Sequence, residues 1–378
     1  MHICDLTTLW IDGDGGGVNT YLLEKARYLA GRPDTTHTII VPGKRSEKRL
    51  LFGSTVFTIK SKPLPSNPQH RVLTQFAEVK RLLRQQDPDI VEVDCAYMLG
   101  QVARGALSRD VPIVGFYHVH LPTFIARPRA SRFGSLAAST AERFAWRYVS
   151  YCSQYSDRLV VASKDIHERL TQAGFANLEY VSLGVNLDLF QPRRTVEREE
   201  PLTILSVGRL SPEKDLATLI QAFKLLRPRE RFRLRIVGEG PIGRPLARQA
   251  ASDPRIELLG SCPYGEELAA IYRSADVLAV PSPNETFNLT VLEGLASGLP
   301  VVAIDRGGPK NLVTSEVGEL ARPGDAEDFA RKLEAVSRRQ IQPATCRALV
   351  EAHYSWERTF DRLLEVYERA REGRAVAT

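Results

Sequence analysis

The chain has 378 residues, of which 43% are hydrophobic and 25% are charged, and its formal net charge is +6. This composition excludes a disordered or collagen-like chain, and no apolar run reaches the roughly 18 residues that a membrane-spanning helix needs. The length favours two domains, and the positive charge lies mostly in the N-terminal half, which favours an anionic partner there. The five cysteines are scattered and no signal peptide is evident, so we expect reduced thiols in a cytoplasmic protein.

The N-terminal segment combines a strand pattern at residues 1–9 with helical apolar spacing at 18–29. The glycine-rich loop between them, IDGDGGG at 11–17, lacks the G-x-G-x-x-G spacing of dinucleotide-binding folds. We therefore do not expect a nicotinamide or flavin enzyme.

Two Asp-x-Asp patterns, Asp12–Asp14 and Asp87–Asp89, are candidate metal sites. The second directly precedes an apolar strand at 90–93, as a normal strand entry does. Further along the chain, Arg209 and Lys214 supply positive charge that a phosphate ligand would otherwise take from a metal ion. We therefore expect neither a required metal nor another cofactor.

The segment 111–117, VPIVGFY, is typical of a buried strand. It delivers His118 and His120 to its carboxyl end, which is where ligands bind in parallel sheets. A zinc site is not expected, because no third ligand is apparent. The other elements expected in this half are strands at 38–41, 56–59 and 159–162 and helices at 76–84 and 163–171.

Residues 122–151 are basic and carry apolar side chains at helical spacing. Two interpretations stay open. The segment is either a basic amphipathic element that rests on an anionic membrane and presents a lipid acceptor, or a solvated helix that packs on its own domain. The arginines are Arg127, Arg129, Arg132, Arg143 and Arg147, opposed only by Glu142, and the main apolar positions are Phe133, Leu136, Phe144 and Tyr148.

The second half begins after a charged linker at 195–201 and alternates strands with helices. This succession predicts a doubly wound parallel sheet. The expected strands are 203–207, 234–237 and 256–259, and the expected helices are 215–226, 245–251 and 265–274.

A strand at 277–280, a turn, and a helix with Gly298 as its C-terminal cap come next. Two carboxylates, Glu285 and Glu293, flank the start of this helix at the carboxyl edge of the sheet. The backbone N–H groups of Phe287, Asn288 and Leu289 lie at the positive helix end and are expected to seat a phosphate.

A diphosphate carries more negative charge than one helix end offsets, so the cations Arg209 and Lys214 suit the same ligand. They lie in GRLSPEK at 208–214, between a strand and a helix start. The carboxylates would accept hydrogen bonds from the hydroxyl groups of a ribose and a hexose. These residues suit a diphosphate with a ribose on one side and a hexose on the other, and the alternative that stays open is a solvated Glu293 on an ordinary amphipathic helix.

These motifs together resemble the family-4 retaining glycosyltransferases, which have the GT-B fold. The matching segments are GRLSPEK at 208–214, VGEGP at 237–241, E-x7-E from Glu285 to Glu293, GGVNTYLLEKARYLA at 16–30 and YSW at 354–356. The resemblance implies an α/β protein of two Rossmann-like, doubly wound domains that face each other across a cleft. We expect an acceptor domain at 1–192, a donor domain at 193–355 and a last helix within 356–378 that packs back on the first domain.

The resemblance also implies roles for individual residues. His118, with His120 as the runner-up, would contact the sugar, and the loop at Gly16 and Gly17 would approach it. Glu285 would hold the sugar hydroxyls and Glu293 the ribose. Gly208, Arg209 and Lys214 would hold the diphosphate and stabilise it as it leaves.

The expected function is retaining transfer of a hexose to a hydroxyl of a lipid, a glycan or a small molecule, with a UDP-sugar favoured as donor and GDP-mannose second. The alternatives are a catalytically silent sugar-nucleotide sensor and a GT-B epimerase or phosphorylase. Two departures from the family pattern stand near the site: Asn288 replaces a common glycine, and Lys310 and Asn311 follow Gly307–Gly308–Pro309, where an acidic residue is frequent. Nucleic-acid binding is not expected, because the basic residues lack an aromatic platform. The location expected is the cytoplasm, and peripheral contact at the inner face of the membrane follows only if the segment 122–151 rests on lipid.

Overall fold

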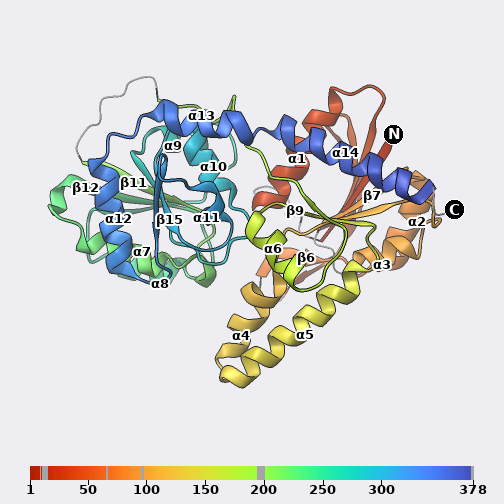
Figure 1. Cartoon of the computed structure of the whole chain (residues 1–378), viewed down its shortest axis with the longest axis horizontal. Helices are drawn as coiled ribbons and strands as arrows, with labels where there is room; N and C mark the ends of the chain where they lie inside the picture. Colours follow the sequence, from red (N-terminus) through yellow and green to blue (C-terminus); the bar gives the residue numbers. More distant parts are fainter. Residues whose placement is uncertain (9, 11–15, 65–66, 95–97, 194–200, 376–378) are drawn as a thin grey trace. The chain divides into compact units, whose positions relative to one another are not determined.

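The computed structural model describes residues 1–8, 10, 16–64, 67–94, 98–193 and 201–375. The chain forms two compact units, Met1–Ser182 together with Trp356–Thr378, and Leu183–Ser355. This division after Ser182 lies earlier than the boundary at 192/193 expected from the sequence. The expected loop at 11–15 and most of the expected linker lie outside the described residues. Each unit is an α/β domain built on one large sheet (Figure 1).

The sheet of the first unit has eight strands in the order β10-β9-β8-β7-β1-β2-β4-β3. All neighbouring strands pair in parallel except β3, which runs antiparallel to β4 at the edge. The chain leaves β1 toward β2 on one side and later returns to β7 on the other, so the strand order reverses between β1 and β7. The strands are β1 (His2–Thr7), β2 (Thr36–Gly43), β3 (Glu47–Leu51), β4 (Ser54–Lys60), β7 (Ile90–Asp94), β8 (Ile113–Phe116), β9 (Arg158–Val161) and β10 (Leu178–Tyr180), and β5 (Lys62–Leu64) and β6 (Asn67–Val72) form a separate ribbon.

The helices of this unit cover the apolar faces of that sheet. In α2, Val79, Leu82 and Leu83 recur at helical spacing and are buried against Val91 and Val93 of β7. The helices are α1 (Gly16–Ala30), α2 (Phe76–Gln86), α3 (Leu99–Arg104), the π-helical turn η1 (Pro122–Ala126), α4 (Arg127–Ser131), α5 (Ser135–Ser153), α6 (Lys164–Gln172) and α14 (Trp356–Ala375).

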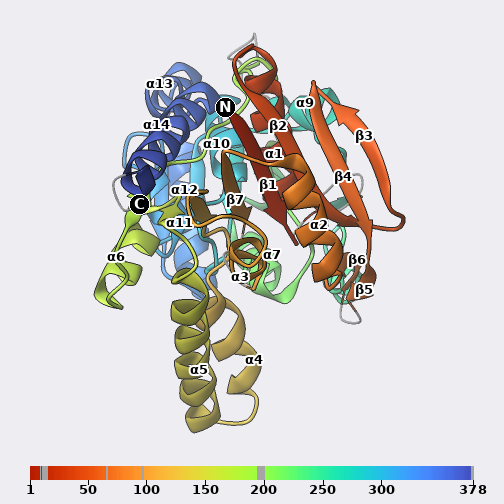
Figure 2. The ribbon, with the colours of Figure 1, turned by 90° about the vertical axis from the view of Figure 1, so that its right-hand side faces the viewer.

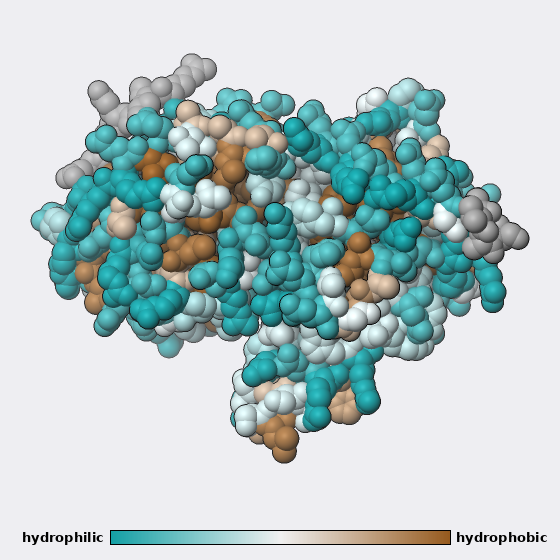
Figure 3. Space-filling model, in the orientation of Figure 1, coloured by the Kyte–Doolittle hydropathy of each residue, from teal (hydrophilic) through white to brown (hydrophobic). Residues whose placement is uncertain are grey.

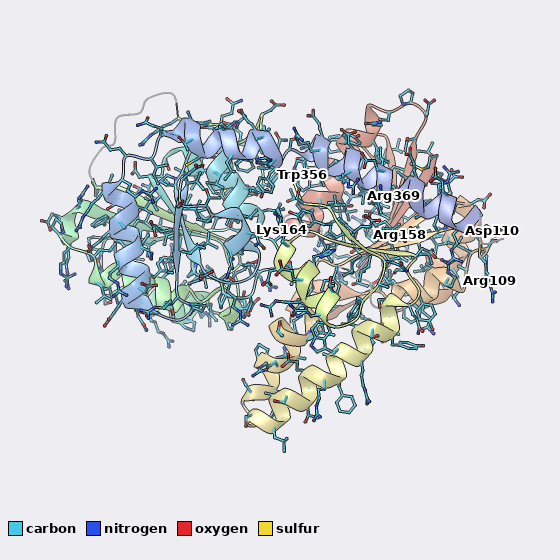
Figure 4. All side chains as sticks on the ribbon, viewed as in Figure 1. Arg109, Asp110, Arg158, Lys164, Trp356 and Arg369 are labelled. Carbon is cyan, nitrogen blue, oxygen red and sulfur yellow. The ribbon has the colours of Figure 1, made fainter. Side chains whose placement is uncertain are left out.

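The last helix, α14, belongs to this first unit although it lies at the far end of the sequence. It packs against α1, which it crosses in Figure 1, and Trp356 at its start stacks on Phe360 with ring centroids 5.4 Å apart. Near its other end, Arg369 lies beside Arg158 of β9 (Figure 4). Both arginines pair with Glu179 of β10, at 3.0 Å and 3.7 Å, so α14 is tied to the sheet edge by charge as well as by packing.

The sheet of the second unit has six parallel strands in the order β13-β12-β11-β14-β15-β16, which confirms the predicted doubly wound α/β fold. The order reverses between β11 and β14, and at such a switch point the loops at the carboxyl ends of the two strands leave a crevice for a ligand. The strands are β11 (Leu202–Val207), β12 (Phe232–Val237), β13 (Ile256–Gly260), β14 (Val277–Val280), β15 (Val301–Ile304) and β16 (Gly318–Ala321). The helices are the 3₁₀ turns η2 (Pro212–Lys214) and η3 (Arg229–Arg231), α7 (Leu216–Leu225), α8 (Gly243–Ala250), α9 (Glu266–Arg273), α10 (Leu289–Ala296), α11 (Gly308–Leu312), α12 (Ala326–Arg338) and α13 (Pro343–His353).

The segment at 122–151, whose apolar side chains recur at helical spacing, forms a hairpin of two helices. The chain turns at Gly134, whose φ of 102° favours glycine, so that α4 and α5 run back along each other. Figures 1 and 2 show both helices extending away from the sheet of the first unit. In the described part of the chain, no helix is both long and apolar enough to cross a membrane.

Candidate active site

A pocket lies at the switch point of the second unit, between the loops that follow β11 and β14. Its floor is formed by strand ends and its rim by the loop at Gly208 and Arg209, by Lys214, and by the turn that carries Glu285 and Asn288. Five predicted donor-site residues therefore line one pocket. The described lining residues are Ser206, Val207, Gly208, Arg209, Lys214, Leu216, Ile236, Ala279, Val280, Pro281, Ser282, Glu285 and Asn288.

The charged groups of this pocket are paired in the structure. Lys214 Nζ lies 2.6 Å from Glu285 Oε1, and both side chains are largely buried. Arg209 Nη2 lies 2.6 Å from Glu213 Oε1, four residues along the chain and more exposed. Burial raises the pKa of Glu213, but hydrogen bonds with its own backbone and Ser211, together with the charge of Arg209, hold it below its usual value. Two cations and an acceptor carboxylate thus meet at one opening, an arrangement suited to a diphosphate joined to a hydroxyl-rich group.

Glycines allow the loops around the pocket to pack against each other. A Cβ on Gly238, in the VGEGP motif, would lie 1.9 Å from the carbonyl oxygen of Gly208. A Cβ on Gly308 would lie 2.1 Å from the carbonyl oxygen of Phe287. The loop after β14 is also joined to the Glu213 backbone by Ser282, whose hydroxyl donates to that carbonyl at 3.1 Å. The chain segments that carry Arg209, Lys214 and Glu285 are therefore held in fixed relation within this unit.

Helix α10 begins beside the pocket, and Asn288 is its N-cap. The Asn288 side chain accepts hydrogen bonds from the backbone N–H of Val291 at 3.3 Å and from the Thr290 hydroxyl at 2.5 Å. Asn288 has φ of 91°, a region that glycine adopts more readily than other residues. The predicted phosphate seat at Phe287, Asn288 and Leu289 thus lies at the pocket-side end of α10, and its role stays a prediction.

Glu293 lies inside the second unit, and it is not among the described residues that line the pocket. Tyr272 of α9 donates a hydrogen bond from its hydroxyl to Glu293 Oε2 at 2.6 Å. Burial raises the pKa of Glu293 to about 7, and the Tyr272 bond offsets only part of that rise. Burial likewise raises the pKa of Tyr272. Glu293 therefore titrates near neutral pH. The two carboxylates also differ in position, since Glu293 is interior and Glu285 lines the opening of the pocket.

In the first unit, His118 follows β8 and is held by Asp94 at the end of the neighbouring strand β7. Its Nε2 lies 2.9 Å from Asp94 Oδ1, and its side chain is 7% exposed. The imidazole stacks on Phe116 at 4.1 Å and meets the ring edge of Tyr21 from α1 at 5.3 Å. Burial raises the pKa of Asp94, with the His118 hydrogen bond acting in the opposite direction.

His120, the runner-up, lies in the core of the first unit. It is fully buried, its Nδ1 lies 3.0 Å from the Tyr117 hydroxyl, and its ring meets Trp146 at 5.2 Å. Burial, aided by the positive charge of Arg169, lowers the pKa of His120 to about 4. His120 is therefore neutral at physiological pH and packs as a core residue.

The remaining predicted positions have simpler surroundings. Gly16 opens α1 with φ of 70°, and Gly17 follows it in the first turn, whereas the preceding loop with Asp12–Asp14 lies outside the described residues. Asp87 caps α2, and Asp89 accepts a hydrogen bond from the His2 backbone at 2.6 Å. Across the described ranges, no group of three or more His, Cys, Asp or Glu side chains is arranged to hold a metal ion.

Two partners in this geometry did not follow from the sequence: Tyr272 beside Glu293 and Asp94 beside His118. Asp94 had a signal, because it ends the apolar strand β7 at the carboxyl edge of the sheet. Tyr272 had none, since it occupies an ordinary apolar position of α9.

Comparison with known proteins places both units in one family. The family model described as Glycosyltransferase Family 4 matches residues 15–189, and the one described as Glycosyl transferases group 1 matches residues 201–339. A GDP-mannose-dependent alpha-mannosyltransferase of Mycobacterium tuberculosis is 32% identical over 357 residues, which cover 91% of this chain and 88% of the relative. A D-inositol 3-phosphate glycosyltransferase of Geodermatophilus obscurus is 31% identical over 400 residues, which cover 97% and 87%.

Solved structures show the same fold at lower identity. A sucrose-phosphate synthase of Thermosynechococcus elongatus superposes with a TM-score of 0.80 at 19% identity, over 98% of this chain and 99% of that one. HepE of Anabaena, in complex with UDP, superposes with a TM-score of 0.72 at 17% identity, over 98% of this chain and 100% of that one. The resemblance drawn from the motifs is confirmed: the chain belongs to the family 4, group 1 glycosyltransferases of the GT-B fold, and it is an enzyme that transfers a hexose from a nucleotide sugar.

Proposed function

We propose that the chain transfers mannose from GDP-mannose, with retention of the anomeric configuration, to a hydroxyl of a glycolipid-type acceptor. The observation that carries the proposal is the Lys214–Glu285 pair, 2.6 Å apart at the mouth of the switch-point pocket, with Arg209 on the same rim. The relatives reverse the order of donors expected from the sequence, because two of them are named for GDP-mannose dependence.

In the structure, Lys214 pairs with Glu285 and Arg209 pairs with Glu213. Donor binding would give both cations a new partner. A diphosphate brings at least two negative charges to Lys214 and Arg209, which makes it a stronger partner than one carboxylate. Glu285 would then accept hydrogen bonds from the sugar hydroxyls while staying beside Lys214. When the bond between sugar and phosphate breaks, charge grows on the leaving phosphate, and the two cations stabilise it there.

Retention is what the family resemblance implies, and the positions of the carboxylates argue against a covalent intermediate on the way to the product. Glu285 is engaged by Lys214, and Glu293 lies in the interior with Tyr272, so neither is presented as a free nucleophile. The leaving phosphate would itself take the proton of the acceptor hydroxyl on the same face of the sugar, as the family resemblance implies. His118, held by Asp94, would contact the sugar, as the family resemblance implies.

The proposed acceptor class comes from the relatives. One is named as a phosphatidylinositol dimannoside mannosyltransferase and several as D-inositol 3-phosphate glycosyltransferases. A hydroxyl of an inositol or mannosyl headgroup fits both. The enzyme would act in the cytoplasm, at the inner face of the membrane, where such a headgroup is accessible.

The test is transfer from GDP-mannose and UDP-glucose to a panel of inositol and mannosyl acceptors, with the product anomer read by NMR. We expect an α-mannoside from GDP-mannose, and a rise in melting temperature with this donor that corresponds to about 2.7 kcal/mol at a hundredfold excess over Kd. Product analysis also separates transfer from epimerisation or phosphorolysis. A shift and turnover with UDP-glucose alone would overturn the donor assignment.

The site assignment has its own variant and control. Lys214→Met should lower kcat about 10²–10³-fold, because it removes a cation aimed at the developing phosphate charge. Lys332→Met is the matched control, since Lys332 pairs with Glu319 at 2.8 Å in the same unit, with similar exposure and away from the pocket. If Lys214→Met transferred mannose at the parent rate, the site would lie elsewhere.

A further inference from the structure

The hairpin formed by α4 and α5 exposes large apolar side chains to solvent. Phe133 and Leu136 at its turn are 72% and 77% exposed, and Phe144 of α5 is 65% exposed. Figure 3 shows apolar surface at the end of this projection. Tyr148 and Tyr151 are also exposed, so five of the large apolar side chains exposed in the described residues fall within one short segment.

The exposed large apolar side chains of α5 lie on one side of this helix, and Phe133 precedes it at the turn. At about 100° per residue, Leu136, Phe144, Tyr148 and Tyr151 fall within about 120° of one another around the helix. The buried residues of α5, which include Ala138, Ala145 and Val149, lie on the opposite face. The inner face thus packs on the first unit, and the outer face has an apolar stripe with no cover among the described residues.

The same face is strongly basic. Arg143 and Arg147, four residues apart, flank the apolar stripe and are exposed, and no acidic partner is found for either in the described part of the chain. Arg129 and Arg132 add charge near the turn, and Arg132 lies over the Phe133 ring at 4.8 Å. The only acidic side chain in the hairpin, Glu142, is paired with Arg127 at 2.7 Å.

We propose that the hairpin docks on an anionic phospholipid bilayer, with Phe133 and Leu136 entering the headgroup region and the arginines binding lipid phosphates. Guanidinium groups match phosphate oxygens in bidentate geometry, and long arginine stems reach the headgroups while apolar neighbours go deeper. An amphipathic helix buries its apolar side about 5–10 Å into such an interface while the neighbouring arginines stay at the headgroups. A second copy of this chain fits less well, because it would bring the same unpaired arginines against each other.

The proposal deepens the proposed function, which has the enzyme act at the membrane face, by assigning the residues that would make the contact. It would bring the first unit to the plane in which a lipid headgroup is presented. Vesicle binding is measured in the absence of any donor. A chain that does not bind vesicles therefore leaves the donor assignment untouched, and a wrong donor assignment leaves the membrane proposal untouched.

The experiment is flotation of the full chain with vesicles of phosphatidylcholine alone and of phosphatidylcholine mixed with phosphatidylglycerol. We expect binding to the mixed vesicles only, weakening as salt is added. The double variant Arg143→Gln/Arg147→Gln should bind them about 30-fold more weakly, at about fivefold for each arginine. Phe133→Ser/Leu136→Ser should bind at least about tenfold more weakly, through loss of apolar insertion.

Matched controls separate a local effect from a general one. Arg244→Gln/Arg248→Gln removes an exposed arginine pair with the same spacing from α8, and Leu50→Ser removes a leucine that is 75% exposed on β3. Both should bind vesicles as the parent does. Equal binding to neutral and anionic vesicles, or unchanged binding by the hairpin variants, would overturn the proposal. So would self-association that the hairpin variants abolish while no vesicle binding is seen.

Discussion

Glu293 is a carboxyl group held in the interior of the second unit by a single tyrosine hydroxyl. Burial raises its pKa from 4.5 to about 7. A folded-state pKa above the unfolded value means that the folded chain holds the proton longer as pH rises. Protonated Glu293 therefore stabilises the folded chain, relative to ionised Glu293, by on the order of 3 kcal/mol. This stabilisation is complete below pH 4.5 and is lost as the pH rises through about 7.

This predicts that Glu293→Gln stabilises the free enzyme at alkaline pH. The amide oxygen still accepts the Tyr272 hydrogen bond, but it carries no charge to bury. We expect equal stability of variant and parent near pH 4.5 and a gain of up to about 3 kcal/mol for the variant at pH 8. Urea unfolding followed by circular dichroism measures the difference.

The exposed Glu267 of α9 gives the control for that measurement, because Glu267→Gln changes the same charge without burial. Its stability difference from the parent should stay small at both pH values. A Glu293→Gln variant no more stable than the parent at pH 8 would mean that the carboxylate is better solvated than its surroundings indicate.

At the scale of one element, helix α10 depends on the conformation of Asn288. The residue combines an N-cap, which stabilises a helix by roughly 1 kcal/mol, with a φ of 91° that costs about as much for a residue other than glycine. The glycine common in the family at this position avoids the backbone cost but lacks the cap.

Two substitutions separate these contributions. Asn288→Ala loses the cap and adds strain, because alanine tolerates a positive φ less well than asparagine, so we expect a loss of about 2 kcal/mol in unfolding free energy. Asn288→Gly loses the cap but relieves the strain, so its stability should remain within about 1 kcal/mol of the parent. Chemical denaturation of both variants checks this order, and an alanine variant as stable as the glycine variant would contradict it.

The sequence predicted the elements whose patterns are strong and local. The buried strand β14, the cap at Gly298 and the strand β15 all follow from apolar runs and turn residues within the segment. The edge strand β3 was missed, because EKRLL has neither alternation nor burial and pairs only through β4. The hairpin turn at Gly134 was missed too, since apolar spacing continues across it.

Of the candidate site, the sequence predicted only the charged residues and the position of the helix start. Arg209, Lys214 and Glu285 meet in one pocket because loops at the same sheet edge carry them. The interior position of Glu293 depends on Tyr272, 21 residues away along the chain and on another helix. Such a contact depends on how α9 packs against α10, which no local pattern encodes.

At the scale of the whole chain, the first unit is completed by a helix from the other end of the sequence. Tyr367 of α14 accepts a hydrogen bond from Lys25 Nζ at 2.7 Å and donates one to Glu92. Lys25 also pairs with Asp5 at 2.6 Å and Glu92 at 3.1 Å, and all four groups are buried. Burial raises the pKa of Glu92 to about 7, with the charge of Lys25 opposing that rise.

The structure predicts that the Tyr367 hydroxyl stabilises the first unit, and the same pair of helices offers a control. Tyr367→Phe leaves Lys25 and Glu92 each short of a partner in a dry interior, which should cost about 1–3 kcal/mol. Tyr28→Phe removes a hydroxyl that also joins α1 to α14, through Asp361, but at the solvent-exposed surface. That change should cost less than about 1 kcal/mol.

Tryptophan fluorescence reports this difference selectively. The three tryptophans, Trp10, Trp146 and Trp356, all belong to the first unit. Urea unfolding followed by their emission should therefore show a clear drop in midpoint for Tyr367→Phe and a small one for Tyr28→Phe. Equally small drops would mean that α14 is held by its apolar face, through Trp356 and Phe360, and that the buried polar cluster adds no net stability, as is found for some buried charge pairs.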